Sequence, residues 1–473
     1  MCYNIEKQFD RILESYHDEM IENLCRFLRI RSVFGPEEEN APFGAGSKEA
    51  FDFAMELGRE KGFDCVNYEN YAGEINFGEG EEAAGVICHV DVVPEGEGWT
   101  HDPYGGEVID GNIYGRGAVD DKGCFIAAFY ACLALKESGV PLTRQIKHII
   151  GTNEELGHFP CIRYYKEHTD KMPVCGIVPD SWFPAAFAEK GIWNYEFRRS
   201  FSREKAGEEK PVLLSFSGGD AFNVVMPEAK AVFRGTKQQF LEIIKDAEET
   251  IPADRIRIKE EDDILTIRVL GKSAHASTPE IGVNAGSYML QLLRKMEFFP
   301  SSVCSTLHTF ADQAAFDTNG TGLGIYSCDH TGELTNNLGI IRFFENEFYA
   351  GSNIRYPITQ DLEKLEDTLI AKAAEAGCDC EVIMKNPHFY VDPESPLVQT
   401  LVKIYQDMTG DTQTPPIAHG GGSYARILEN FIPYGPSIRG EELSFHKQDE
   451  HISCERLLLL SKIYARALYA MAK

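Results

Sequence analysis

Two patterns of hydrophobic residues alternate along the first part of the chain. Apolar residues three or four positions apart predict helices over residues 5–30 and 47–61, and a longer apolar stretch predicts another from Cys124 to about Lys136. Short runs of consecutive apolar residues predict buried strands at 86–90, 146–150 and 176–178. Strands that alternate with helices in this way favour right-handed crossovers and a mainly parallel sheet sandwiched by helices.

The pattern changes near residue 186. Over residues 190–385, extended segments in which apolar and polar residues alternate are combined with two long helical patterns. The extended segments lie at 192–197, 213–216, 265–270, 340–344 and 348–355, and the helical patterns at 283–296 and 362–376. This combination is typical of an α+β domain.

Near the C-terminus the α/β character returns, with predicted helices at 396–409 and 455–471. We therefore expect the fold class to be α/β. A mainly parallel-sheet α/β/α domain would be formed by residues 1–185 and 389–473, and an α+β lid domain at residues 186–388 would interrupt it.

The composition excludes several classes of function. The chain has 473 residues, 46 Lys and Arg against 74 Asp and Glu, and a formal net charge of −28. Such a surface repels phosphate backbones and anionic lipids, so we expect neither a nucleic-acid nor a membrane partner. The 13 cysteines show no paired spacing, and the N-terminus lacks the apolar core of a secretory signal. These features predict a cytoplasmic protein with reduced cysteines.

Histidine and acidic residues follow predicted strands or precede predicted helices. They are His89 and Asp91, Asp120, the Glu154-Glu155 pair and Asp180. Because the carboxyl ends of parallel strands meet at one edge of a sheet, we expect these side chains to converge. They would repel one another without a cation, and a centre of two metal ions that share one carboxylate removes that conflict. Adjacent glutamates in an extended segment point in different directions, so one can bind a metal while the other acts as general base.

Each motif also has a purely structural interpretation. Asp120-Asp121 could cap the N-terminus of a helix, Glu154-Glu155 could form a solvated turn, and Asp180 after Pro179 could form another turn. All of these structural interpretations would have to be correct at the same time, at equivalent strand ends. One centre of two metal ions accounts for every motif.

A series of motifs in a specific order resembles the two-zinc aminoacylase/carboxypeptidase/dipeptidase metallopeptidases. The motifs are HVDVVP (89–94), GRG (115–117) with DDKG (120–123), GTNEE (151–155), VPD (178–180), GKSAHASTP (271–279), NIRYP (353–357), GGGSYAR (420–426) and FHKQDE (445–450). The resemblance spans nearly the whole chain and implies a zinc-peptidase-like catalytic domain with a lid. Within the family, the chain looks closest to the bacterial dipeptidases of the PepV and Sapep type.

The resemblance implies a ligand set for two divalent metal ions. One metal would be held by His89, Asp120 and Asp180. The other would be held by Asp120, Glu155 and His446, so that Asp120 bridges the two ions. Two histidines with three carboxylates suit Zn²⁺, and a carboxylate-rich set also accepts Mn²⁺ or Co²⁺.

The same resemblance assigns roles beside the metals. Asp91 would orient His89, and Glu154 would act as general base and acid: it takes a proton from the metal-activated water and returns it to the leaving nitrogen. The family has a cis peptide bond after the bridging aspartate, which here is the Asp120-Asp121 bond. Asn153 stands where relatives often have Asp, at a position that is not a ligand.

Further residues are implied to bind the substrate. His275, in the lid, would donate a hydrogen bond to the tetrahedral oxyanion. Arg355 would grip the C-terminal carboxylate of the substrate with bidentate hydrogen bonds, together with Asn223 and backbone amides of Gly421, Gly422 and Ser423.

These roles predict a metal-dependent dipeptidase that acts on small, unblocked peptides. An alternative in the same family is an N-acyl-amino-acid or N-succinyl amide hydrolase. An alternative from a different class is a catalytically inactive, metal-stabilised binding protein. Relatives that dimerise have a smaller lid and borrow the oxyanion histidine from their partner. The lid at 186–388 is long enough for two α+β halves, so we expect a monomer in which His275 acts within its own chain.

Overall fold

The computed structural model of the protein describes residues 2–204, 210–441 and 444–473. The chain forms two compact units. The first unit contains the residues up to Ala188, together with Tyr390–Ala418 and Gly422–Lys473. The second unit contains Glu189–Phe389 and His419–Gly421, so it is inserted into the sequence of the first.

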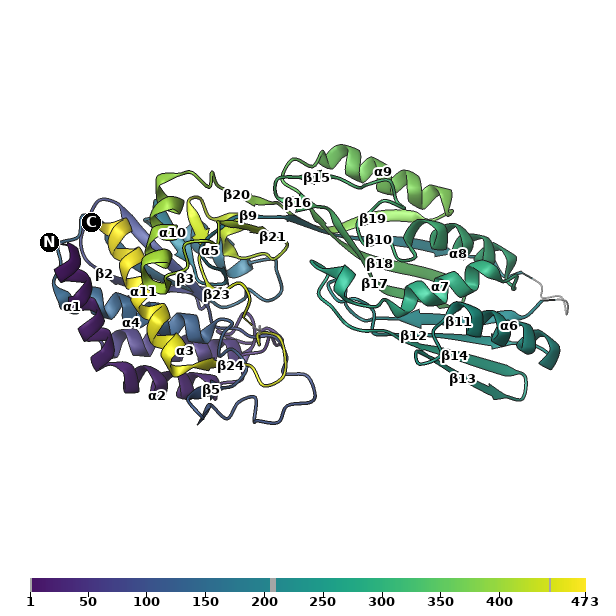
Figure 1. Cartoon of the computed structure of the whole chain (residues 1–473), viewed down its shortest axis with the longest axis horizontal. Coiled ribbons are helices and arrows are strands. Elements are labelled where there is room, and N and C mark those ends of the chain that lie inside the picture. Colours follow the sequence, from purple (N-terminus) through teal and green to yellow (C-terminus); the bar gives the residue numbers. More distant parts are fainter. Residues whose placement is uncertain (1, 205–209, 442–443) are drawn as a thin grey trace. The chain divides into compact units, whose positions relative to one another are not determined.

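The first unit is built on a mixed six-stranded sheet with helices packed against it (Figure 1). In spatial order, its strands are β1 (Asp64–Tyr68), β2 (Ala72–Phe77), β6 (Gln145–Gly151), β3 (Ala83–His89), β7 (Cys175–Val178) and β22 (Phe431–Pro433). The helices are α1 (Cys2–Ser15), α2 (His17–Leu28), α3 (Ala45–Glu60), α4 (Lys122–Ser138), α5 (Pro160–His168), α10 (Pro396–Thr409) and α11 (Cys454–Ala472).

Smaller elements complete this unit. Strands β24 (His451–Ser453), β5 (Asn112–Tyr114) and β4 (Glu107–Ile109) form a three-stranded sheet, and β23 (Pro436–Ser437) pairs with β8 (Ser181–Trp182). A 3-10 helix, η2, covers Tyr424–Ile427. The short strands β9 (Ala186–Glu189), β20 (Phe389–Tyr390) and β21 (Ile417–His419) lie where the chain passes from one unit to the other.

The six-stranded sheet is parallel over four strands and antiparallel at one edge. Strands β6, β3, β7 and β22 run parallel, as predicted for strands that alternate with helices. Strands β1 and β2 pair antiparallel, and β2 also pairs antiparallel with β6. The three residues between β1 and β2 are too few for a crossover, so those two strands form a hairpin. The predicted α/β class is confirmed, with this antiparallel edge as a refinement.

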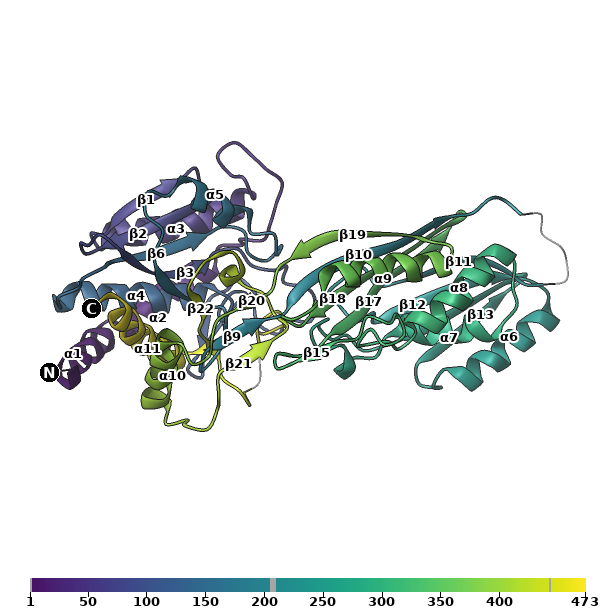
Figure 2. The same cartoon turned by 90° about the horizontal axis from the view of Figure 1, so that it is seen from above.

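Strand β3 lies in the middle of the parallel part, and all seven of its residues are buried. Neighbouring strands cover both of its edges, and helices α4 and α11 pack side by side along it (Figure 2). Helices α3 and α5 contact β1 and β2. Burial on all sides explains why β3 reads as a continuous apolar run rather than an alternating one.

Helix ends follow local chemistry. Helix α10 begins with Pro396, whose missing N–H is not needed in a first turn, and ends at Gly410, whose φ is +77°. Helix α4 likewise ends at Gly139, with a φ of +63°. These signals explain why the bounds of both helices could be read closely from the sequence.

The described part of the second unit forms one eight-stranded antiparallel sheet with helices against it (Figure 1). In spatial order, the strands are β13 (Ile256–Glu261), β14 (Ile264–Leu270), β12 (Glu228–Arg234), β11 (Val212–Gly218), β17 (Thr335–Phe344), β18 (Glu347–Tyr356), β10 (Gly191–Ser200) and β19 (Asp379–Asn386). The helices are α6 (Lys237–Thr250), α7 (Ala285–Lys295), α8 (Ser301–Ala314) and α9 (Leu362–Glu375). The short elements are β15 (Cys328–Asp329), β16 (Gly332–Glu333) and the 3-10 helix η1 (Pro279–Ile281).

The helices of this unit share one hydrophobic core with the sheet. Buried residues from the strands and from α6, α7, α8 and α9 belong to the same cluster. The prediction of two helices in this region was incomplete, because α6 and α8 are present as well. Helix α6 has a capping box, in which Thr236 and Gln239 each accept a hydrogen bond from the other's backbone N–H.

Among the described residues, no helix combines the length and the hydrophobicity needed to cross a bilayer. The twelve cysteines whose side chains the structure describes are all free of disulfide bonds.

A buried histidine lies in the core of the first unit. His148, on β6, is fully buried and stacks on Phe125 of α4, with ring centroids 4.7 Å apart. Neither ring nitrogen has a hydrogen-bond partner within the described chain. Burial therefore lowers the pKa of His148 to about 3, and the imidazole is neutral at physiological pH.

Replacing His148 with Leu should make the free energy of unfolding less dependent on pH. His148 binds a proton near pH 6.5 in the unfolded chain but only near pH 3 in the folded chain. Its contribution to the free energy of unfolding is therefore complete above pH 6.5 and is lost as the pH falls towards 3. At pH 5 the loss is about 2 kcal/mol. Denaturant unfolding of chelator-treated protein at pH 5 and pH 7.5 measures it. His168→Leu, at an exposed position on α5, is the control. Equal pH dependence in wild type and His148→Leu would contradict the prediction.

Candidate active site

Three neighbouring parallel strands bring polar residues to one edge of the first unit. His89 is the last residue of β3, and it pairs in register with Gly151, the last residue of β6. The Glu154-Glu155 pair follows β6, and Asp180 follows β7, the other neighbour of β3. The strand order β6-β3-β7 therefore accounts for the predicted convergence of these side chains.

The structure brings all five predicted metal ligands together around Asp120. His89 Nε2 lies 2.9 Å from Asp120 Oδ1, and His446 Nε2 lies 3.0 Å from Asp120 Oδ2. His446 Nε2 is also 3.2 Å from Glu155 Oε2, and His89 Nε2 is 4.0 Å from Asp180 Oδ2. Asp120 thus contacts one histidine through each of its oxygens, with a further carboxylate beside each histidine.

The two adjacent glutamates face different members of this group. Glu155 contacts His446 and belongs to a cluster with His89 and Asp120, whereas Glu154 belongs to a cluster with His89 and Asp180. In each cluster the potential ligand atoms lie within 4.8 Å of one another. The divergence expected for neighbouring residues is present, and geometry alone allows Glu154 to act either as a ligand or as a base.

Asp91 holds both the histidine and the glutamate pair. The Nδ1 atom of His89 lies 2.9 Å from the Asp91 carbonyl oxygen and 3.4 Å from the Asp91 carboxylate. The Asp91 carboxylate also accepts hydrogen bonds from the backbone N–H groups of Glu154 and Glu155, at 2.9–3.1 Å. A carbonyl oxygen can only accept, so Nδ1 carries the proton and Nε2 is the nitrogen available to a cation.

Asp121 has a part in this site that the sequence analysis did not assign. Its Oδ2 accepts a hydrogen bond from the backbone N–H of His89 at 3.0 Å, and its side chain is fully buried. The Asp120-Asp121 peptide bond is cis, as the resemblance implied. The doubled aspartate was the available signal, because only one of the two residues can fill the bridging position.

Burial and crowding set the charges of this group. Burial alone would raise the pKa of Asp120, but hydrogen bonds from His446 and His89 outweigh it and hold that pKa well below its usual range. Burial raises the pKa of Glu154 and of Asp180 well above their usual ranges, and neighbouring carboxylates add to the rise. The same cause raises the pKa of Glu155. If all of these carboxylates were ionised, the group would carry more negative charge than two imidazoles can balance, so without a cation the protonated forms of Glu154 and Asp180 are favoured.

The donors present suit divalent cations. The group combines two imidazole nitrogens with carboxylate oxygens, and Glu155 Oε1 is buried without a hydrogen-bond partner in the part of the chain that is described. A nearby dication favours the ionised form of every carboxylate and uses the oxygen that is otherwise unsatisfied. Imidazole with carboxylate is a ligand set of zinc and of other first-row divalent metals.

Two of the predicted substrate-binding residues, Asn223 and His275, lie next to each other in the second unit. Val224 and His275 form a backbone bridge, and Ala276 N–H donates to the Asn223 carbonyl at 2.9 Å, so Asn223 lies next to His275. The Nδ1 of His275 lies 2.7 Å from Ser277 Oγ. Both Asn223 and His275 are on exposed loops, where a ligand can reach them.

Arg355 lies in the same unit, near the end of β18. It is 5% exposed, and it donates from Nε to Asn353 Oδ1 at 2.8 Å and from a terminal nitrogen to the Gly420 carbonyl at 2.9 Å. The neighbouring Gly421 N–H donates to His419 Nδ1 at 3.0 Å. Arg355 thus donates hydrogen bonds to two neutral oxygens, one on a side chain and one on the backbone.

The other two residues of the predicted glycine loop belong to the first unit. Ser423 is fully buried, and its side chain caps η2 by accepting a hydrogen bond from Ala425 N–H. The Gly422 Cα lies close to the Arg426 guanidinium, since a Cβ there would come within 2.6 Å of Arg426 Nε. The structure thus gives Ser423 a structural contact, and its predicted part in substrate binding stays a prediction.

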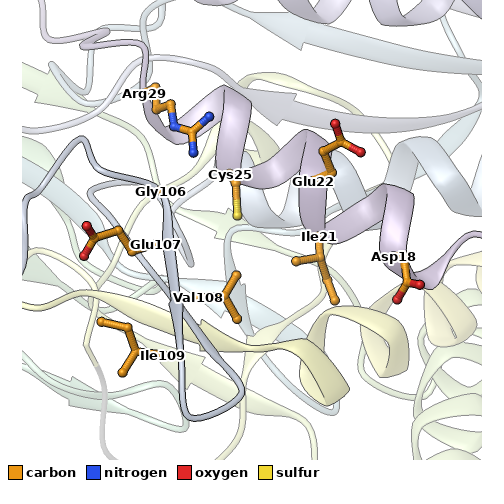
Figure 3. A pocket seen from close by; sticks show the side chains of 9 residues that line it. All are labelled: Asp18, Ile21, Glu22, Cys25, Arg29, Gly106, Glu107, Val108 and Ile109. Carbon is orange, nitrogen blue, oxygen red and sulfur yellow. The ribbon is translucent and has the colours of Figure 1, made fainter.

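Two other features do not belong to this group. A surface hollow of about 730 Å³ is lined by residues of α2, by Arg29 and by residues 106–109, none of which is a predicted site residue (Figure 3). A cluster of Glu297, Cys304 and His308 lies in the second unit. There, His308 Nε2 lies 2.8 Å and 3.0 Å from the carbonyl oxygens of Met296 and Leu293. Carbonyl oxygens can only accept hydrogen bonds, so Nε2 of His308 carries a proton and donates a hydrogen bond to the carbonyls at the end of α7. This histidine therefore caps the C-terminal end of α7.

Solved structures share this fold. Human carnosine dipeptidase 1 superposes with a TM-score of 0.58 and 13% identity, and the match covers 99% of this chain and 98% of that one. The dipeptidase Dug1p from Saccharomyces cerevisiae also gives a TM-score of 0.58, with 12% identity and 98% coverage of both chains. At these identities the likeness concerns the fold alone.

Sequence comparison gives the family. A Bacillus subtilis protein named "putative dipeptidase YtjP" is 38% identical over 96% of this chain and 98% of its own length. A "putative dipeptidase" of Staphylococcus epidermidis is 35% identical over 98% of both chains. The model of peptidase family M20/M25/M40 matches residues 85–470, which include all the predicted ligands. The chain therefore belongs to peptidase family M20/M25/M40 and is a peptidase, a hydrolase of peptide bonds.

Proposed function

We propose that the protein is a dipeptidase that uses two divalent metal ions to hydrolyse unblocked dipeptides. The observation that carries the proposal is the position of Asp120, which reaches a different histidine with each carboxylate oxygen. One bridging carboxylate with a separate histidine on each side is what a two-metal centre requires. The names of the relatives support the substrate class.

The proposed ligands divide into two sets that share Asp120. His89 and Asp180 complete one set, and Glu155 and His446 complete the other. When bound, the metals, Zn²⁺ or alternatively Mn²⁺ or Co²⁺, lower the pKa of water towards neutrality and polarise the scissile carbonyl.

Glu154 is the proposed general base and acid. It lies beside His89 and Asp180 but is not needed to complete either ligand set. Its carboxylate takes a proton from the attacking water and delivers it to the leaving nitrogen as the C–N bond breaks. Asp91 positions Glu154 for this transfer through the hydrogen bond to its backbone N–H.

Several further residues are proposed to recognise the substrate. Arg355 would bind the C-terminal carboxylate, because a guanidinium can form bidentate hydrogen bonds with a carboxylate. Asn223 and the amides of Gly421, Gly422 and Ser423 would add hydrogen bonds to it. His275 would stabilise the tetrahedral oxyanion.

We also propose that the protein is a cytoplasmic monomer. The insertion is long enough for two lid halves, which would let His275 act within its own chain, and the free cysteines fit a reducing compartment. Sedimentation equilibrium measures the oligomeric state directly.

Glu154→Gln should lower kcat by about 10²- to 10⁴-fold, because glutamine keeps the shape of the side chain but cannot accept a proton. Metal analysis of the same sample should still find two ions per chain. Glu167→Gln, at an exposed position on α5, is the control. Near-normal turnover would place the base elsewhere, and loss of a metal ion would make Glu154 a ligand.

A panel of matched substrates tests the substrate class. Free dipeptides should be cleaved faster than the same dipeptides with an acetylated N-terminus, and dipeptide amides should be poor substrates because they lack the carboxylate proposed to bind Arg355. The measurement is kcat/KM for each compound with metal-loaded protein.

The panel also separates the alternatives. Faster cleavage of the acetylated series would favour an N-acyl-amino-acid hydrolase. Metal-loaded protein that cleaves no member of the panel would favour the inactive binding protein.

A further inference from the structure

A buried carboxylate grips the segment that leads to Asp120. Glu450 is fully buried, and its side chain accepts hydrogen bonds from the backbone N–H groups of Gly117, Val119 and Asp120, at 2.9–3.1 Å. Three amides therefore converge on one side chain directly before the bridging position. The sequence analysis included Glu450 in a motif but gave it no role.

Arg116 completes this arrangement. It is 1% exposed, and its guanidinium donates to Glu450 Oε2 at 2.6 Å and packs over the Trp99 ring at 5.1 Å. The same guanidinium donates to the Glu95 carbonyl at 3.3 Å. A buried ion pair with these additional bonds holds Glu450 in one orientation.

Glu450 also belongs to the loop that carries His446, four residues earlier. Gly115 N–H donates to the Glu450 carbonyl at 2.9 Å, so the two loops are joined through the backbone as well as through the side chain. His89 is held separately, by β3 and by its bonds to Asp91 and Asp121. Glu450 therefore links two of the five proposed ligands, Asp120 and His446, whereas His89 is held without it.

We propose that Glu450 is a positioning residue, which sets the spacing between Asp120 and His446 and so determines how tightly the metal shared by Asp120, Glu155 and His446 is bound. The inference rests on the proposed metal centre. The other metal, held on the side of His89, depends less on this link, because β3 and Asp121 fix His89 independently.

A second buried ion pair in the same unit provides a control. Lys147 donates to Glu74 at 2.6 Å, both side chains are buried, and Tyr165 and Asn76 also donate to the Glu74 carboxylate. Glu74 touches none of the proposed metal ligands in these contacts. Substitution of Glu74 therefore shows how much breaking a buried ion pair in this unit lowers the free energy of unfolding, without disturbing a proposed ligand.

The test is a zinc titration of the full-length, chelator-stripped protein in competition with a chromophoric chelator. Wild type should bind two equivalents of Zn²⁺. Glu450→Gln should bind one equivalent about 10- to 100-fold more weakly, as expected when the support of a ligand is lost, and the other, which shares Asp120 but not His446, with a smaller loss of affinity. Glu74→Gln should lower the free energy of unfolding while leaving both affinities unchanged.

A double variant covers the case in which Glu450→Gln folds poorly. Combining it with Arg116→Met removes the unpaired buried charge, and this should restore folding but not the zinc affinity, because the grip on the three amides is still lost. The inference, but not the proposed function, would be overturned if Glu450→Gln bound zinc with wild-type affinities or if Glu74→Gln lost as much zinc affinity as Glu450→Gln. Wild type that binds no zinc would overturn the proposed function and the inference together.

Discussion

Asp120 contacts two histidines at once, one with each carboxylate oxygen, and the surrounding structure is arranged to hold it there. Burial opposes a charged carboxylate at this position, yet the two imidazoles keep it ionised. Glu154, Glu155 and Asp180 crowd the same volume and cannot all be charged beside it unless cations supply positive charge. This electrostatic constraint connects the geometry of the site to metal-dependent hydrolysis.

The scaffold holds the site residues in two different ways. The parallel strands β3, β6 and β7 fix His89, the glutamate pair and Asp180 at one sheet edge, and Asp91 joins the first two by hydrogen bonds. The remaining ligands come from loops, where no strand register sets their position. Glu450 and Arg116 replace that register with a buried ion pair and hydrogen bonds to backbone amides.

Much of this arrangement could be predicted from the sequence, because its signals are local. The apolar run before His89 and the glycine after α10 depend only on neighbouring residues. The antiparallel edge of the sheet and the helix α8 were missed, because strand order and tertiary packing decide them. Glu450 was missed for a similar reason: its partner, Arg116, lies more than 300 positions earlier in the chain.

The central claim is that Asp120 bridges two metal ions. X-ray diffraction from crystals of the zinc-loaded protein, recorded at the zinc absorption edge, tests it most directly. The account predicts two anomalous peaks roughly 3.5–4 Å apart, one beside His89 and Asp180 and the other beside Glu155 and His446, with Asp120 between them. A single peak, or peaks remote from Asp120, would contradict it.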